Sequence, residues 1–411
     1  MGFLDSLFRR KPTQDQFATL FIAAVRQRGY TGELTYKADE FRLLHGDSAY
    51  FNLHNAYHAY CDARGGQRQG ALQGYVSTLL SSGQAMPHSL AEARPLLRPV
   101  IRGRSAVEAV RMHHLRNDGN DAAFHPAVRP FGDDCVVLLA LDRPESIATL
   151  TNGPEASWGV TFDEALAIAI DNLRDSADNF VEVAPGVYGG GWEDGYDISR
   201  VLLPDMLERV PVRGRPVFMM PTRDLLLVSG DNDDDGLMKM VELCQQVIPH
   251  GRPVSPCMYR HGEAGVERFV PPHDELRQRQ ANLARMLAKG DYDAQKEALE
   301  HLYEEQGIDV FVATYNLFVQ NGDADASFSL ATWTRGVDTS LPEVDRLALV
   351  RPDAADEIGE VRVVAWEQAV ALMAPLLERE NLYPVRYRTR GFPSDAQLAQ
   401  LRAMDLSLIH I

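Results

Sequence analysis

The polar residues with the greatest potential for chemistry are grouped between residues 194 and 224, where turns and strand ends are expected. Carboxylates such as Asp197 and Asp224 can form an acid–base pair or hold Mg²⁺, and Arg200 and Arg223 can each grip an anion through two hydrogen bonds. We favour structural roles for them, because caps, turns and a buried ion pair need no distant partner. The candidate binding residues are Asp197, Ser199, Arg200, Arg223 and Asp224, with Asp194 and Asp205 beside them.

A second acidic group matches the spacing of a calcium-binding loop, D-x-[DN]-x-[DN]-G-x₅-E. Its candidate ligands are Asp231, Asp233, Asp235 and Glu242. A strand rather than a helix is expected before the loop, and Lys239 occupies the ninth position, so any calcium site would be a strand-loop-helix variant. Acidic residues at a helix N-terminus are also stabilised by the helix dipole without an ion. Calcium is thus the only cofactor that the sequence suggests, and the favoured interpretation has no cofactor.

The elements that must position these residues follow from hydrophobic periodicity. Residues 1–130 contain apolar residues at helical spacing, and the first helix is expected to be capped by Thr13 and to end near Gly29. Residues 131–275 alternate short apolar strands with helices. The predicted fold class is therefore α+β, with a mainly helical N-terminal region followed by a mixed αβ domain that contains antiparallel hairpins.

Local signals within the middle domain are more specific. Thr161 and Glu164 form a capping box that begins a helix, and residues 136–141 form a short apolar strand. Strands at 217–220 and 225–228 flank a turn, so Arg223 and Asp224 are expected at the tip of a hairpin.

The C-terminal part is expected to be separate. Residues 276–306 read as a helical connector, and residues 307–405 as a small αβ module with an antiparallel sheet and Trp333 and Trp366 in its core. The last six residues, 406–411, match the translation of a transposon mosaic-end adapter used in shotgun library preparation. We expect them to be a sequencing artefact, with the native C-terminus lost beyond residue 405.

Composition excludes several classes of protein. Of the 411 residues 45% are hydrophobic and 24% charged, which is typical of globular chains, and no apolar run approaches the roughly 18 residues of a membrane span. The acidic net charge of -17 disfavours a nucleic-acid binder. Four cysteines without a C-x-x-C pair, and a start without a secretory signal, predict a cytoplasmic protein with reduced thiols. The Arg- and Ala-rich composition is typical of bacterial coding.

Four motifs in order carry a family resemblance. They are Leu53-His-Asn with Tyr57 and Tyr60, residues 158–173 (WGVTFDEALAIAIDNL), residues 195–204 (GYDISRVLLP) and residues 221–230 (PTRDLLLVSG). Together they resemble the bacterial YtpQ-like family, a domain of unknown function. The resemblance spans roughly residues 13–272. It implies a bacterial cytoplasmic protein to whose family no agreed biochemical activity is assigned.

Two functions follow from these patterns. Because no complete catalytic constellation is found, and no G-x-S-x-G motif surrounds Ser199, we favour a non-enzymatic binding or interaction protein, for which a protein partner is allowed. The alternative is a metal- or anion-dependent enzyme of the hydrolase type, built on Asp197, Arg200, Arg223 and Asp224. The enzyme requires these side chains to converge on one open pocket.

Overall fold

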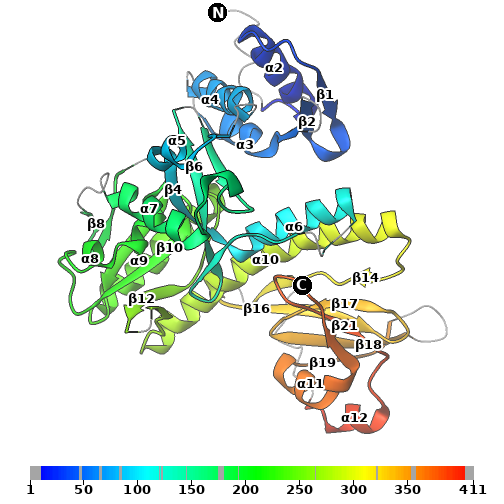
Figure 1. Cartoon of the computed structure of the whole chain (residues 1–411). Coiled ribbons are helices and arrows are strands. Elements are labelled where there is room, and N and C mark those ends of the chain that lie inside the picture. The colour runs from blue at the N-terminus through cyan, green and yellow to red at the C-terminus, as the bar shows by residue number, and fades with distance from the viewer. Residues whose placement is uncertain are drawn as a thin grey trace, which may run out of the picture. The chain divides into compact units, whose positions relative to one another are not determined.

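The computed structural model has an α+β fold with several antiparallel sheets (Figure 1). Two compact units are distinguished: Met1–Arg98, Ala140–Leu150 and Pro154–Ala165 form unit 1, and Pro99–Leu139, Thr151–Gly153 and Leu166–Ile411 form unit 2. Their division does not coincide with the expected boundaries at residues 130 and 306. The structure describes residues 11–45, 49–63, 67–82, 86–119, 121, 124–144, 146–174, 180–192, 194–263, 265–320, 323–352 and 358–402, so the adapter-like segment 406–411 lies outside the described residues.

Unit 1 packs helices against a three-stranded antiparallel sheet. The predicted cap at Thr13 is confirmed: its hydroxyl accepts a hydrogen bond from the Gln16 amide at 3.2 Å, and the Gln16 side chain accepts one from the Thr13 amide at 3.0 Å. Phe17 and Phe21 on this helix are buried against Leu43 of the sheet. The elements are α2 (Gln14–Gln27), β1 (Leu34–Lys37), β2 (Arg42–His45), β3 (Ala49–Asn52), α3 (His54–Asp62), α4 (Gln67–Ser82), α5 (Leu90–Ala93) and β7 (Ser146–Leu150).

Unit 2 is built on a six-stranded antiparallel sheet with the strand order β13-β12-β10-β11-β9-β8. The predicted hairpin is confirmed, because β10 and β11 pair around a turn at Arg223 and Asp224. Helix α9 buries Leu237 and Met240 against Met219 of the sheet. The elements are β8 (Val181–Ala184), β9 (Val187–Gly189), β10 (Pro216–Thr222), β11 (Leu225–Gly230), α9 (Asp234–Val247), β12 (Met258–Gly262) and β13 (Gly265–Arg268).

The predicted apolar strand corresponds to β6 (Cys135–Arg143), whose first seven residues are buried. Strand β5 (Arg129–Phe131) pairs antiparallel with the beginning of β6 within unit 2. The predicted capping box is confirmed: the Thr161 amide donates to the Glu164 carboxylate at 2.8 Å, and the Glu164 amide donates to the Thr161 hydroxyl at 3.2 Å. The remaining elements of this part are β4 (Leu97–Gly103), α6 (Arg104–Asp118) and α7 (Phe162–Arg174).

Helix α10 (Asp274–Gln306) corresponds to the predicted connector and is packed along its length within unit 2. Its Leu283 belongs to the core under the six-stranded sheet, and its Tyr292 to the core of the C-terminal part. Leu299 packs with Met112 of α6, which lies alongside α10 in Figure 1. The helix therefore joins two cores. No helix in the described part of the chain is long and apolar enough to cross a membrane.

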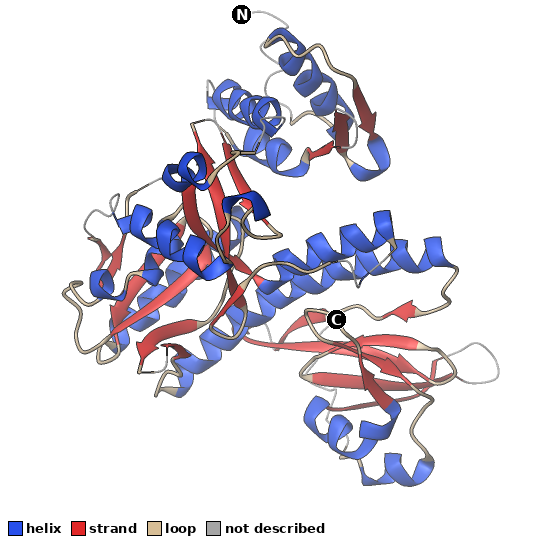
Figure 2. Cartoon of the chain, viewed as in Figure 1, coloured by secondary structure: helices blue, strands red, loops and turns tan. Residues whose placement is uncertain are grey.

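The C-terminal part contains two four-stranded sheets, β15-β16-β18-β19 and β14-β17-β21-β20. The predicted antiparallel pairing is present between β15 and β16, β18 and β19, β17 and β21, and β20 and β21, but β16 pairs parallel with β18 and β14 pairs parallel with β17. Trp333 and Trp366 are buried in the core, as predicted, and helices cover the sheets (Figure 2). The elements are β14 (Phe311–Val312), β15 (Asn316–Gln320), β16 (Asp323–Thr334), β17 (Thr339–Pro342), β18 (Arg346–Pro352), β19 (Ile358–Ala365), α11 (Trp366–Met373), β20 (Leu377–Arg379), β21 (Arg386–Thr389) and α12 (Asp395–Gln400).

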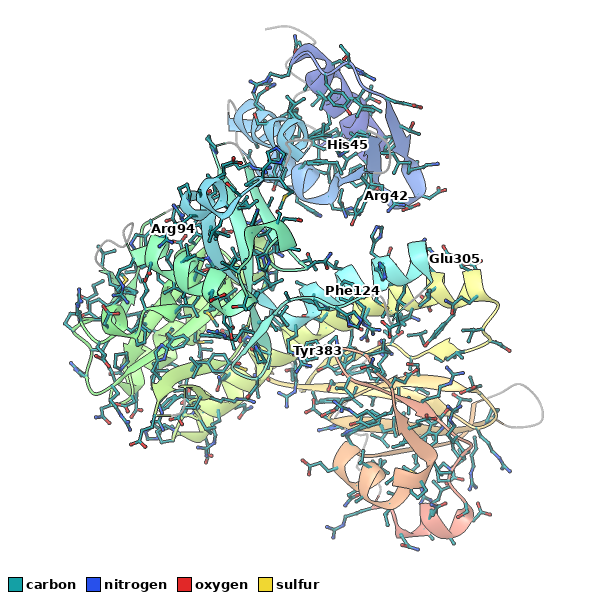
Figure 3. The ribbon with its side chains drawn as sticks, in the orientation of Figure 1. Arg42, His45, Arg94, Phe124, Glu305 and Tyr383 are labelled. Carbon is teal, nitrogen blue, oxygen red and sulfur yellow. The ribbon has the colours of Figure 1, made fainter. Side chains whose placement is uncertain are left out.

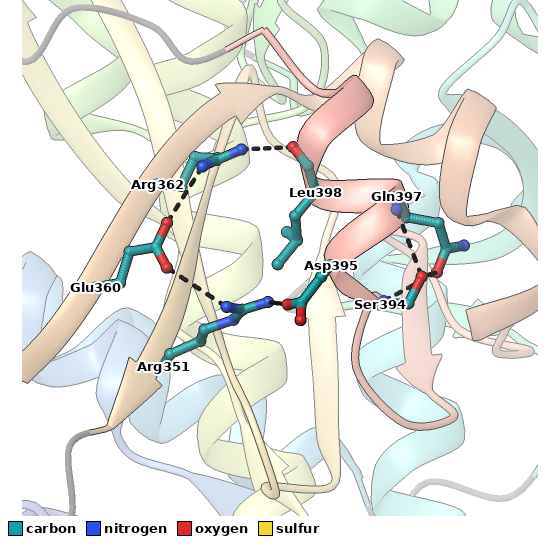
Figure 4. Close-up of polar contacts among 7 residues, drawn as sticks. All are labelled: Arg351, Glu360, Arg362, Ser394, Asp395, Gln397 and Leu398. Atoms are coloured by element: carbon teal, nitrogen blue, oxygen red, sulfur yellow. Dashed lines mark hydrogen bonds and ion pairs between the residues drawn. The ribbon is translucent and has the colours of Figure 1, made fainter.

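Two arginines of the first of these sheets hold the last described helix, α12, in place (Figure 4). Arg351 of β18 forms an ion pair with Asp395 at the start of α12 and lies 3.5 Å from Glu360 of β19. Arg362 of β19 donates to Glu360 at 3.2 Å and to the Leu398 carbonyl of α12. The helix is thus fastened to the sheet through both its side chains and its backbone.

Candidate functional site

Most of the predicted Asp and Arg residues are brought together in unit 2 by two local elements. Asp197 and Arg200 lie on a 3₁₀ helix, Asp197–Leu202, and Arg223 and Asp224 lie at the β10–β11 turn. The 3₁₀ helix contacts both strands of this hairpin. The negative charge of Asp224 also acts on the ionisation of Asp197, as expected for neighbouring groups.

Arg200 is part of the scaffold of this region. Its side chain is fully buried and donates to both carboxylate oxygens of Asp194, at 3.0 and 2.7 Å. Its guanidinium lies 4.2 Å from the centre of the Trp192 ring, within cation–π range. Burial alone would raise the pKa of Asp194, but hydrogen bonds from Arg200 and from the Tyr196 amide hold it below its usual value. The ion pair considered for Arg200 is therefore present, but its carboxylate partner, Asp194, is half-buried rather than buried.

Asp197 is a buried carboxylate beside that ion pair. It is 3% exposed, and its Oδ2 atom has no hydrogen-bond partner within the described residues. Burial raises its pKa, and the negative charges of Asp194 and Asp224 raise it further, while a backbone hydrogen bond and the Arg200 charge act the other way. The cap considered for Asp197 or the buried Ser199 is wrong: in this described segment neither side chain accepts a capping hydrogen bond from the backbone amides of the 3₁₀ helix or of the helix that follows, Pro204–Leu207.

The hairpin turn adjoins two arginines that the sequence did not single out. Arg252 pairs with Asp224 at 3.0 Å, and its backbone carbonyl accepts a hydrogen bond from the Arg223 amide at 3.1 Å. Arg102, near the end of β4, donates at 2.8 Å to the carbonyl of Ile101. We call Arg102, Arg223 and Arg252 the arginine cluster.

Within the arginine cluster, the charge of Arg102 has no carboxylate partner among the described residues. Burial, with the charges of Arg223 and Arg252, lowers the pKa of Arg102 to about 9, although Asp224 and Tyr196 oppose the change. Arg102 stays protonated near neutral pH. Among the described residues it has no ion-pair partner, because its hydrogen bond goes to a neutral carbonyl.

A guanidinium presents its N–H donors in a planar fork that fits phosphate and carboxylate oxygens. It does not release a proton at physiological pH and accepts no hydrogen bonds. The cluster therefore offers anion binding rather than proton transfer. Asp205, the remaining member of the predicted group, forms exposed ion pairs with Arg174 at 2.7 Å and Arg209 at 3.1 Å.

Three of the four carboxylates of the predicted calcium loop have other partners. Asp233 caps α9 by accepting from the Gly236 amide at 3.2 Å. Asp231 accepts from the Arg215 amide at 2.8 Å, which fastens it to the sheet backbone. Glu242 lies further along α9 and pairs with Lys239 at 3.0 Å, while Asp235 is exposed. Within the described ranges, no three or more His, Cys, Asp or Glu side chains form a group that could hold a metal ion.

Arg102 and Arg252 carried no local signal that could have identified them. Arg102 follows the apolar Val100 and Ile101 in a strand, and Arg252 follows a helix end as many surface arginines do. They become neighbours of the hairpin turn only when β4 and the segment after α9 pack in unit 2. Comparisons with models of protein families, with curated proteins and with solved structures find no match for the chain.

Proposed function

We propose that this chain is a non-enzymatic binding protein of the bacterial cytoplasm that holds an anionic group at the arginine cluster. The supporting observation is the charge on Arg102, which is repelled by Arg223 and Arg252 and is paired with no carboxylate among the described residues. A bound phosphate or carboxylate group would replace this repulsion with charge-assisted hydrogen bonds. The motif at residues 221–230, which contains Arg223, supports membership of the YtpQ-like family as part of the same proposal.

The test is calorimetric titration of the full chain with inorganic sulfate and with inorganic phosphate at low ionic strength. Arg102→Gln is expected to weaken binding about tenfold, because a hydrogen bond to a charged group contributes about 1.5–3 kcal/mol. Arg335→Gln, which removes one exposed positive charge from the C-terminal part, is the matched control and is expected to change affinity less than about twofold. Equal affinity in both variants, or no binding to the unaltered chain, would contradict the proposal.

The second candidate is an anion-dependent hydrolase, and the observation that supports it is Asp197. A buried carboxylate with a raised pKa beside an anion site has the properties of a general acid. This candidate expects the full chain to hydrolyse 4-nitrophenyl phosphate, with or without Mg²⁺, and Asp197→Asn to abolish turnover while sulfate still binds. Sulfate binding without turnover would favour the binding protein.

A further inference from the structure

A pocket of about 250 Å³ lies within unit 2, apart from the residues of the arginine cluster. At about 30 Å³ for each water molecule of the liquid, this volume corresponds to roughly eight waters and suits a small organic ligand. Its walls come from α6, the residue before β6, the segment before β12, α10 and three segments of the C-terminal part. Tyr383, labelled in Figure 3, belongs to the last of these segments.

The polar side of the pocket is negatively charged. Asp134, Asp291 and Glu343 line it, and none of the described lining residues is Lys, Arg or His. The first two carboxylates are held by hydroxyl groups: Asp134 accepts from Ser255 at 2.8 Å and from Tyr259 at 2.6 Å, and Asp291 accepts from Ser105 at 2.7 Å.

Hydroxyl donors orient these carboxylates but do not neutralise them. Among the described residues, none of the three pocket carboxylates forms an ion pair. Burial raises the pKa of Asp291, and the charge of Asp134 raises it further, while the Ser105 hydrogen bond opposes the change. The pocket is therefore an environment in which a second negative charge is costly and a positive charge is favoured.

The rest of the wall is aromatic and apolar. Tyr292 and Tyr315 stack with their ring centres 5.0 Å apart, and the Arg104 guanidinium lies 4.3 Å from the centre of the Tyr383 ring. The Arg386 guanidinium likewise lies 5.2 Å from the centre of the Tyr292 ring, so arginines of the chain itself occupy the cation–π positions on Tyr292 and Tyr383. The apolar wall is made of Val254, Pro256, Ala284, Leu287, Ala288 and Pro384.

We propose that this pocket binds a small organic cation, with an ammonium or guanidinium head between Asp134 and Asp291 and a short apolar tail against Leu287 and the tyrosine rings. The apolar wall distinguishes this ligand from a hydrated inorganic ion, and no metal-ligand group is found within the described ranges. The proposal is independent of the anion site, because the two sets of residues do not overlap.

The test is calorimetric titration of the full chain with n-butylammonium and n-butylguanidinium, and with butyrate and butanol as anionic and neutral probes of similar size. Binding of the cations, and weaker or undetectable binding of butyrate and butanol, is expected. Asp291→Asn, which keeps the side-chain shape, is expected to weaken cation binding about tenfold or more.

Glu297→Gln, on an exposed position of the same helix, is the matched control and is expected to leave cation binding unchanged. Arg102→Gln is expected to leave it unchanged as well, which separates this proposal from the anion site. Butanol binding as tightly as butylammonium would show an apolar cavity without charge selectivity and would overturn the proposal. So would the absence of binding by both cations at millimolar concentration, or equal affinity in Asp291→Asn and Glu297→Gln.

Discussion

The arginine cluster and the carboxylate pocket differ in the sign of the charge that they hold and in how that charge responds to pH. Both lie in unit 2 and hold several charges of one sign, and neither Arg102 nor the pocket carboxylates form an ion pair among the described residues. An aspartate such as Asp291 can lose its charge by taking up a proton, and burial has raised its pKa toward that outcome. Arg102 keeps its charge near neutral pH, because even after burial its pKa is about 9. Protonation of Asp291 can therefore reduce the negative charge of the pocket when no ligand is bound. Arg102 cannot lose its charge in this way, so a bound anion would be needed to compensate it.

In a third arrangement, the ion pair of Arg200 with Asp194, a buried positive charge has a carboxylate partner. Arg200 is more deeply buried than Arg102, yet its charge is matched by two hydrogen bonds to Asp194. The comparison teaches that burial by itself does not identify a binding residue in this protein. The informative feature is a charge without a carboxylate or guanidinium partner.

The largest expected effect concerns this compensated arginine. Arg200→Met removes the buried partner of an ion pair and leaves the half-buried Asp194 without its main donor, so the unfolding free energy should fall by somewhat less than the roughly 3–5 kcal/mol typical of a fully buried pair. Arg102→Gln should cost far less, because it removes a repelled charge. Urea unfolding followed by tryptophan fluorescence measures both. If the two variants lost similar amounts of unfolding free energy, Arg200 could not be distinguished from Arg102 as the residue with the structural role.

An intermediate effect is expected from pH. As pH falls from neutral toward and through the raised pKa of Asp291, the carboxylate is protonated, so butylammonium binding should weaken. The other titratable groups near Asp291 are Asp134 and the neutral Tyr383. Arg104 contacts the ring of Tyr383 and is the nearby positive charge. Sulfate binding at the arginine cluster should stay constant over this range. Calorimetry at each pH checks both ligands, and parallel pH profiles would contradict the comparison.

The same titration has a consequence for stability. The pKa of Asp291 is raised in the folded state, so the unliganded chain should become more stable relative to Asp291→Asn as pH falls from neutral toward that pKa. Unfolding of the two chains by urea at each pH measures the difference. A difference that stays the same over the range would show that Asp291 does not titrate in this way.

The smallest expected effect comes from Asp224. This exposed carboxylate pairs with Arg252 and competes with any anion for it. Asp224→Asn should therefore tighten sulfate binding a few-fold, in keeping with the roughly 0.2–1 kcal/mol of an exposed ion pair. Weaker sulfate binding in this variant would show that Asp224 orients Arg252 for the ligand rather than competing with it.

The sequence predicted what depends on neighbours along the chain. The helix cap at Thr13, the capping box at Thr161 and the hairpin around Arg223 follow from spacings of a few residues, and the structure contains all three. The α+β class follows from the same periodicities. At the acidic loop, the spacing that matches a calcium loop does not describe the role of Asp233, which caps a helix. A capping side chain needs only the backbone amides that follow it in the chain.

Tertiary structure alone decided which charges meet. Arg102 reaches the turn at Arg223 from a strand more than a hundred residues earlier, and Ser105 hydrogen-bonds to Asp291, which lies 186 residues later in the chain. No local periodicity encodes such encounters, because they depend on how strands and helices pack. The sequence by itself determined the elements and the candidate turn. The packing of β4, α10 and the C-terminal part determined that one group of charges became a cluster of arginines and another a carboxylate-lined pocket.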